Sequence, residues 1–277
     1  MWILHLSDVH LALGENHKIR HDLFLKLMSE KIEEFVAMKD KIVVIICGDI
    51  IYKGDASGYG LATCFFQKMK EIFGYQLMFC PCPGNHDITS DKPNCFHAFN
   101  KFVWDLTNET IINFSVDATA VCRSIEDIDF VLVNSAYHGQ HTYGCVNLDN
   151  LEAILKNSKS CNKIIITHHN LIPVNSGDRS TIVNAYRLLQ LALAYDVKAI
   201  LHGHGHMENI LLIGGKKCRL IGVGSLFFPP EDNLNNQFNL VKYANGSITE
   251  AYAYRYIGDL HGQGRVGDFQ KERLNEL

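Results

Sequence analysis

Short apolar runs, each followed at once by a polar cluster, constrain the fold of this chain more than any other feature. The runs have the length of buried strands and lie at 2–7, 42–46, 76–80, 163–167 and 198–201. Unbroken apolar runs are typical of parallel strands that are covered on both faces. Segments with helical spacing lie between these runs, and this alternation predicts an α/β fold.

The rest of the sequence predicts the helices, the further strands and the domain organisation of this α/β fold. Apolar residues at helical spacing predict helices, whereas residues 111–134 and 208–256 have the character of strands. Gly214-Gly215 and Asn245-Gly246 are typical two-residue hairpin turns. The predicted helices lie at 19–36, 61–73, 94–107, 147–155 and 181–195. Without a Pro/Gly/Ser-rich linker or repeat, we expect one domain over 1–256 and a polar C-terminal extension over 257–277.

Composition limits the classes of function. The net charge of −4 does not provide a broad basic face for nucleic acid. The nine cysteines are scattered without CxxC pairs, which favours a reduced, cytoplasmic protein. The apolar runs are too short to span a bilayer, so no membrane partner is expected. Fourteen histidines against 26 lysines and arginines indicate metal or proton chemistry.

The polar clusters carry the residue types of a metal site. They read SDVH (7–10), CGDI (47–50), PGNHD (83–87), THH (167–169) and HGHGH (202–206). Ligands of open α/β sheets bind at the carboxyl ends of strands, so these clusters should meet at one edge. Carboxylate, imidazole and amide groups suit Mn, Fe or Zn. Asp8 with His10, and His204 with His206, have the i, i+2 spacing that places both side chains on one face of extended chain.

As an ordered set, these motifs resemble the calcineurin-like metallophosphoesterase superfamily. The resemblance covers about residues 1–256 and implies two mixed β-sheets packed as a sandwich and flanked by helices. It also implies two divalent metal ions, with Mn preferred and Fe or Zn as alternatives. One metal would be held by Asp8, His10 and His206, the other by Asn85, His168 and His204, and Asp49 would bridge both. His169 is an alternative to His168, which we prefer because it comes first after the strand.

The same resemblance assigns roles to the rest of PGNHD. His86 would face the substrate phosphate and stabilise or protonate the leaving oxygen, and Asp87 would orient His86 through a hydrogen bond. The reaction it implies is hydrolysis of a phosphoester by a hydroxide that bridges the two metals. Pro83-Gly84 predicts a tight turn from which the next three side chains diverge.

Several stretches resemble the small bacterial cyclic-nucleotide phosphodiesterase branch, namely PGNHD, VLVNSA and THHNLIP. We therefore expect a nucleotide or cyclic-nucleotide phosphodiester as substrate, although Asn170 stands where that branch often has Pro. The residues that could contact substrate are Tyr52, Lys53, His138, His141 and Arg179.

Two other functions stay open at this point. HLSDVHL followed by RHDLFLKL also resembles DNA-repair exonucleases, which makes a DNA exo- or endonuclease one alternative. A non-catalytic scaffold with the same fold is another, but His86, which such a scaffold lacks, is present. Protein phosphatase activity is a weaker option. The oligomeric state is not indicated.

Overall fold

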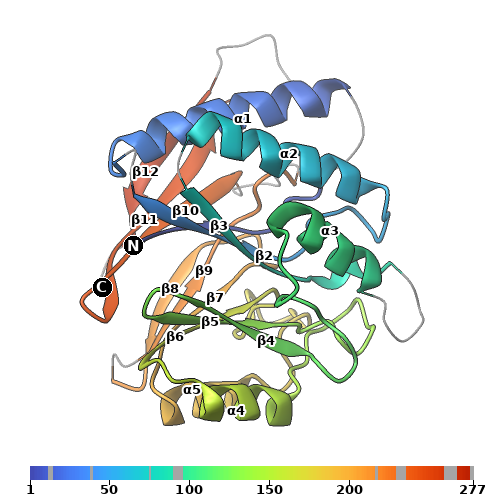
Figure 1. Cartoon of the computed structure of the whole chain (residues 1–277), viewed down its shortest axis with the longest axis vertical. Helices are drawn as coiled ribbons and strands as arrows, with labels where there is room; N and C mark the ends of the chain where they lie inside the picture. Colours follow the sequence, from blue (N-terminus) through green and yellow to red (C-terminus); the bar gives the residue numbers. More distant parts are fainter. Residues whose placement is uncertain are drawn as a thin grey trace.

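The computed structural model describes residues 1–11, 15–37, 40–74, 76–89, 96–215, 218–228, 235–258 and 267–274. They form two six-stranded mixed sheets, which confirms the predicted sandwich (Figure 1). The first sheet has the order β12 (Asp268–Arg273), β11 (Ser247–Ile257), β10 (Gln237–Ala244), β1 (Trp2–Leu6), β2 (Lys41–Cys47) and β3 (Gln76–Cys82). The second has the order β4 (Ala120–Ile125), β5 (Ile128–Val133), β6 (Asn162–Thr167), β7 (Val197–His202), β9 (Cys218–Gly222) and β8 (Asn209–Ile213).

Helices cover the outer faces of both sheets (Figure 1). Those on the first sheet are α1 (Glu15–Glu33), α2 (Gly58–Phe73) and α3 (His97–Thr107), and those on the second are α4 (Leu148–Asn157) and α5 (Ala185–Ala194). Strand β6 shows how the layers form. Ile164 and Ile166 join the core between the sheets, whereas Ile165 joins the core beneath α4 and α5. Successive side chains of a strand point to opposite faces, so an all-apolar strand serves both cores.

Local signals placed several boundaries correctly. Helix α2 ends at Gly74, whose φ of 61° is left-handed, as expected for a glycine that ends a helix. Asn147 caps α4, because its side chain accepts a hydrogen bond from the Asn150 amide at 3.1 Å. Asn245 and Gly246, with φ of 55° and 75°, form the tight turn between β10 and β11. This turn and the strands β8, β9, β10 and β11 are therefore as predicted, but Ile213 pairs with Cys218, so the connection between β8 and β9 is longer than the predicted two-residue turn at Gly214-Gly215. Residues 223–228, which the sequence also predicts as strand, contain none.

Two further stretches differ from the expectation. Residues 111–119 contain no strand, so the predicted strand region begins only at Ala120, the first residue of β4. In the tail, residues 268–273 form β12, which pairs with β11 and is therefore part of the sheet. Phe269 is 2% exposed and its ring lies 5.0 Å from that of Phe24. The sequence does not indicate this strand, because all its side chains other than Phe269 are polar. Residues 259–266 and 275–277 of the predicted extension lie outside the described residues.

Among the helices that the structure describes, none has the length and apolar character needed to cross a membrane. The eight cysteines in the described ranges form no disulfide with one another.

Candidate metal centre

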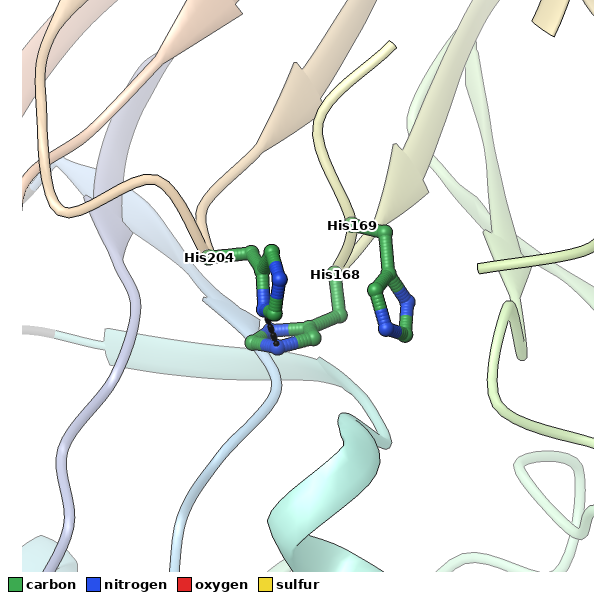
Figure 2. A group of neighbouring side chains, drawn as sticks. All are labelled: His168, His169 and His204. Atoms are coloured by element: carbon green, nitrogen blue, oxygen red, sulfur yellow. Dashed lines mark hydrogen bonds between the residues drawn. The ribbon is translucent and has the colours of Figure 1, made fainter. Parts of the chain in front are cut away.

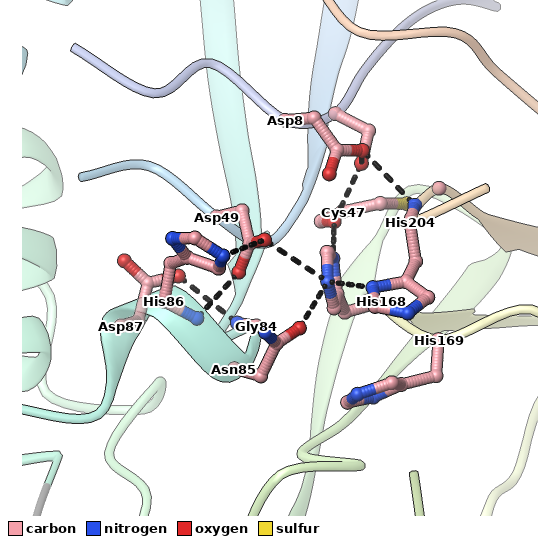
Figure 3. Close-up of polar contacts among 12 residues, drawn as sticks. Asp8, Cys47, Asp49, Gly84, Asn85, His86, Asp87, His168, His169 and His204 are labelled. Carbon is pink, nitrogen blue, oxygen red and sulfur yellow. Dashed lines mark hydrogen bonds and ion pairs between the residues drawn. The ribbon is translucent and has the colours of Figure 1, made fainter. Parts of the chain in front are cut away.

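Five loops meet where β1, β2, β3, β6 and β7 end, and they bring the predicted polar clusters together (Figure 3). Backbone hydrogen bonds join the first two loops directly. The Asp8 amide donates to the Gly48 carbonyl at 3.1 Å, and the His10 amide donates to the Asp49 carbonyl at 2.9 Å. Backbone hydrogen bonds therefore connect two of the loops at the edge where the sequence predicts a site.

Asp8, His10 and His206 form the first group of side chains. Asp8 Oδ1 lies 3.2 Å from His206 Nε2 and 3.7 Å from His10 Nε2. One potential ligand atom from each side chain lies within 4.8 Å of the others. This is the spacing of donors that can share one cation.

The second group centres on His168 Nε2. This atom lies 3.0 Å from Asn85 Oδ1, 3.0 Å from His204 Nδ1 and 3.3 Å from Asp49 Oδ2 (Figures 2 and 3). The other ring nitrogen of His168, Nδ1, donates to the Cys47 carbonyl at 2.7 Å. That bond orients the ring and leaves Nε2 free to bind a metal, as expected for a metal-binding histidine.

The carboxylate of Asp49 lies between the two groups. Its Oδ2 is 3.3 Å from His168 Nε2 and 3.9 Å from His10 Nε2. Its Oδ1 accepts a hydrogen bond from the His86 amide at 2.8 Å, which holds the carboxylate in this orientation. Asp49 is therefore placed to share a cation with either group of side chains.

Charge and burial indicate that this cluster is built for cations. Asp8 is fully buried and Asp49 is 2% exposed, and in the described parts of the chain their ion-pair partners are all histidines. Although burial lowers it, the carboxylate of Asp49 raises the pKa of His168 to about 10. Buried carboxylates need compensating positive charge. The cluster, a set of oxygen and imidazole donors, fits two divalent cations of the Mn, Fe or Zn kind.

The backbone of the cluster is strained. The φ angles are 51° at Asp8, 44° at His10, 51° at Asp49, 66° at His204 and 50° at His206. Left-handed backbone is uncommon for residues other than glycine and collects at functional sites. Five of the seven predicted metal ligands adopt it.

Gly84 allows two of these loops to approach closely. A Cβ atom at this position would lie 2.2 Å from Asp49 Oδ1 and 2.9 Å from His168 Cγ. No side chain larger than hydrogen fits without displacing one of these residues. The glycine of PGNHD therefore allows Asp49 and His168 to reach the same centre.

Comparison with known proteins identifies the family. The profile described as calcineurin-like phosphoesterase matches residues 1–208. This chain belongs to that family. Its members are metal-dependent phosphoesterases, which makes this chain such an enzyme and confirms the resemblance deduced from the motifs.

Curated relatives of the chain are cyclic-nucleotide phosphodiesterases by name. The chain is 24% identical over 216 residues to the 3',5'-cyclic adenosine monophosphate phosphodiesterase CpdA of Haemophilus influenzae, covering 74% of this chain and 70% of the relative. It is 24% identical over 252 residues to a probable cyclic nucleotide phosphodiesterase of Ruthia magnifica, covering 88% and 92%.

Solved structures agree on the fold. A dimetal phosphatase from Danio rerio superposes with a TM-score of 0.61 at 14% identity, over 99% of each chain. GAP50, described as the anchor in the inner membrane complex of Plasmodium, superposes with a TM-score of 0.56 at 10% identity, over 100% of this chain and 89% of that one. At these identities the likeness concerns architecture alone.

Within the calcineurin-like site, His168 and His169 differ in their contacts. His169 is also buried, but its Nδ1 pairs with Ser135 Oγ at 2.7 Å, whereas His168 reaches Asp49 and Asn85. The His169 ring packs 4.6 Å from that of His204 (Figure 2). The choice of His168 over His169 stays a prediction, because both histidines belong to a group with His204 that could hold a metal ion.

The predicted hydrogen bond between Asp87 and His86 is wrong. The Asp87 carboxylate accepts hydrogen bonds from the Gly84 amide at 2.9 Å, the Tyr59 hydroxyl at 3.0 Å and the Ile50 amide at 3.3 Å. It therefore ties the loop after β3 to the loop after β2 and to helix α2. In place of Asp87, the Lys53 amide donates to His86 Nδ1 at 3.0 Å.

The residues predicted to contact substrate lie in different places. The Tyr52 ring is 5.9 Å from that of His86, and Lys53 Nζ lies 5.0 Å from the Tyr52 ring. His141 Nδ1 contacts the Asn85 carbonyl at 3.0 Å, so its loop borders the cluster. His138 is half-buried between Tyr137 and Tyr143. Arg179 is exposed, and in the described residues no hydrogen bond or ion pair joins it to the site.

Sequence reasoning missed three residues that support the cluster. Ser7 Oγ donates to Asp8 Oδ2 at 2.5 Å, and Ser225 Oγ donates to the Asp8 carbonyl at 2.7 Å. The Phe228 ring packs 5.2 Å from His10 and 4.7 Å from His206. Ser7 could have been found from its place beside Asp8. Ser225 and Phe228 lie over 200 residues further on, outside every motif.

Proposed function

We propose that this chain is a phosphodiesterase that uses two divalent metal ions to hydrolyse a nucleotide or cyclic-nucleotide phosphodiester. The observation that carries the proposal is the position of Asp49, whose Oδ2 faces both His10 and His168. A single buried carboxylate between two groups of ligands suits a two-metal site. Within it, Asp8, His10 and His206 bind one metal, and Asn85, His168 and His204 bind the other. Mn is the preferred metal.

The bound metals would activate water as the nucleophile and neutralise the phosphoryl oxygens. The side chain that acts on the leaving group is His86, which is partly exposed at the centre, with its Nε2 4.0 Å from Asp49 Oδ2. Because His86 Nδ1 accepts a hydrogen bond from the Lys53 amide, the neutral ring carries its proton on Nε2. Burial lowers the pKa of His86, which favours this neutral form. His86 Nε2–H therefore donates a hydrogen bond to a substrate oxygen.

The rim favours a diester. Among the residues that the structure describes, the predicted rim residues Tyr52, His138 and His141 are aromatic or imidazole, and Lys53 adds one amine beside Tyr52. Rings of this kind stack on nucleobases, whereas a monoester dianion needs more fixed cations than these described residues offer. The names of the curated relatives support the same substrate class. The absence of disulfides among the eight described cysteines supports a reducing, cytoplasmic setting.

The test compares substrates on Mn-loaded protein. We expect a higher kcat/KM for bis(p-nitrophenyl) phosphate than for p-nitrophenyl phosphate, hydrolysis of at least one cyclic or linear nucleotide diester, and loss of all activity on chelation. Single-stranded DNA serves as a further substrate, since a nuclease would cleave it with steep salt dependence. A preference for the monoester with no nucleotide diester cleaved would assign the chain to the phosphatases instead.

A further inference from the structure

Solvent reaches the metal cluster beside two of its histidines. The side chains of His86 and His206 are 26% and 21% exposed, whereas those of His10 and His168 are 4% and 0% exposed. A phosphoester therefore approaches the cluster along His86 and His206. Side chains that border these two histidines are placed to contact the organic groups of a substrate.

Two aromatic rings border this opening at different places. The ring of Tyr52 lies 5.9 Å from that of His86, and the ring of Phe228 lies 4.7 Å from that of His206. Both rings also approach the ring of His10, Tyr52 at 6.1 Å and Phe228 at 5.2 Å. Tyr52 is 39% exposed and Phe228 is half-buried. Each ring can therefore contact both a histidine of the cluster and a bound molecule.

Backbone hydrogen bonds fix Phe228 beside the cluster. Its amide donates to Ser225 Oγ at 2.8 Å, and its carbonyl accepts from Asn236 Nδ2 at 2.7 Å. Ser225 Oγ in turn donates to the Asp8 carbonyl at 2.7 Å. Ser225 and Asn236 are both buried, so the position of the Phe228 ring is tied to that of a predicted metal ligand. A ring held in this way loses little conformational entropy when a ligand packs on it.

The Phe228 ring is tilted against its two histidine neighbours. Its plane makes angles of 58° with the ring of His10 and 48° with the ring of His206, so neither histidine lies flat on it. A nucleobase stacks on the face of an aromatic side chain, and every base has such a face to offer. Because phenylalanine has no polar atom, Phe228 can bind a ring by stacking but does not select among bases by hydrogen bonding.

The position of His86 assigns the two aromatic rings to different organic groups of a diester. In the proposed function, His86 Nε2–H donates to the leaving oxygen, and the aromatic ring beside His86 is that of Tyr52. The leaving group therefore extends along Tyr52. The other organic group, which stays on phosphorus, extends from a different oxygen and meets the ring beside His206, which is that of Phe228.

We propose that Phe228 determines specificity for the retained group of the diester, and that its ring stacks on the nucleobase of the nucleoside that stays on the phosphate. This role rests on the proposed phosphodiesterase function, which places the leaving oxygen at His86. It adds to that function a second aromatic contact, on the side of the cluster formed by His10 and His206.

The test varies the retained group and keeps the leaving group. Thymidine 5'-(p-nitrophenyl) phosphate and methyl p-nitrophenyl phosphate both release p-nitrophenolate when water attacks phosphorus, and the products keep thymidine or methyl. We expect Mn-loaded parent protein to have the higher kcat/KM for the thymidine diester. Phe228→Leu should reduce the ratio of the two kcat/KM values by about tenfold. Phe228→Tyr, which keeps the ring, should retain the ratio.

Two control variants separate stacking from structural support. Tyr52→Leu changes the side of the leaving group, so it should alter kcat/KM for both diesters by the same factor. Trp104→Leu removes an exposed ring from helix α3 and should alter neither value. If Phe228→Leu does not fold, Phe228→Met, whose flexible apolar side chain fills irregular space, replaces it.

Three results would overturn the proposed role of Phe228. The first is a parent protein that cleaves both diesters without preferring the thymidine one. The second is an equal loss of kcat/KM for both diesters in Phe228→Leu with less bound metal, which would mean that the ring only supports His10 and His206. The third is a fall in the ratio for Tyr52→Leu as large as that for Phe228→Leu.

A binding measurement distinguishes failure of this role from failure of the proposed function. Thymidine 5'-monophosphate, which carries the retained nucleoside, and methyl phosphate are titrated into Mn-loaded protein by calorimetry. Phe228→Leu should weaken binding of the thymidine nucleotide by about tenfold and leave methyl phosphate unchanged. That result from a protein that cleaves neither diester would refute the phosphodiesterase function but support the stacking role. Absence of both cleavage and nucleotide binding up to about 5 mM would refute both.

Discussion

Replacing Gly84 by alanine tests whether the metal centre depends on the close approach of two loops. The added Cβ would lie 2.2 Å from Asp49 Oδ1, 2.6 Å from the Asp49 amide nitrogen and 2.9 Å from His168 Cγ. The nearest contacts include backbone, which cannot rotate away as the end of a long side chain can. Gly84 itself has an extended backbone, with φ of −107° and ψ of −172°. Steric contact, and not backbone conformation, is therefore what the variant changes.

Two magnitudes follow from this geometry. Overpacking a buried site costs about 1–3 kcal/mol of unfolding free energy. A catalytic group displaced by about 1 Å can lose about 10²-fold in rate. Because relief of the contact moves Asp49, His168 or both, we expect the variant to lose roughly 10²-fold in kcat/KM and to bind less Mn.

The matched control is Gly60→Ala. Gly60 lies in helix α2, and a Cβ there would meet nothing within 4 Å. Alanine in a helix is more favourable than glycine, so this variant should gain about 0.4–1 kcal/mol. Its activity should match that of the parent protein, since the position is remote from the cluster.

The assays separate stability from catalysis. Urea unfolding in the presence of chelator gives the free energy of unfolding without metal, and metal analysis and diester hydrolysis follow on Mn-loaded protein. The reasoning fails if the free energy of unfolding of Gly84→Ala lies within about 0.5 kcal/mol of that of the parent protein and the variant hydrolyses the diester at the parent rate. That result would mean that the loop after β3 shifts freely and that its approach to Asp49 is not required.

Three further predictions concern single side chains of the site. Asp49→Ala should reduce the bound metal and remove most activity; retention of two metals at full rate would contradict a bridging role. His86→Gln should keep both metals but slow turnover by about 10²–10⁴-fold, with a smaller loss for p-nitrophenolate leaving groups than for poor ones. An equal loss for both would mean that the hydrogen bond from His86 Nε2–H is not made to the leaving oxygen. His138→Ala should raise KM for a nucleotide diester more than for bis(p-nitrophenyl) phosphate, and equal changes would remove His138 from base recognition.

Much of the fold could be predicted because its signals are local. An all-apolar run such as 42–46 predicts a strand covered on both faces, and Gly74 or Asn147 marks a helix end without reference to distant residues. The metal cluster also follows from local information. Parallel strands place their carboxyl ends at one edge, so the motifs that follow them meet there.

What could not be predicted depends on contacts between distant residues. The sequence places Asp87 beside His86, but its carboxylate bonds to Ile50 and Tyr59, which only the fold brings close. Strand β12 could not be predicted for the same reason. Its side chains are mostly polar, and it is a strand because Phe269 packs on aromatic rings of α1 and β10. A pattern of one buried residue in six carries too little signal to identify an edge strand.

Contacts between the ligand loops hold the strained backbone of the cluster. A residue held in left-handed backbone costs about 1–3 kcal/mol, and five predicted ligands are so held. The strain persists because other contacts fix the same loops. The His10 amide bonds to Asp49, the His204 amide bonds to Asp8 Oδ2 at 2.9 Å, and the His86 amide bonds to Asp49 Oδ1. In each case the backbone of one ligand loop bonds to a residue of another. The loops therefore hold one another in place and keep the two buried carboxylates, Asp8 and Asp49, aligned beside the histidines that pair with them.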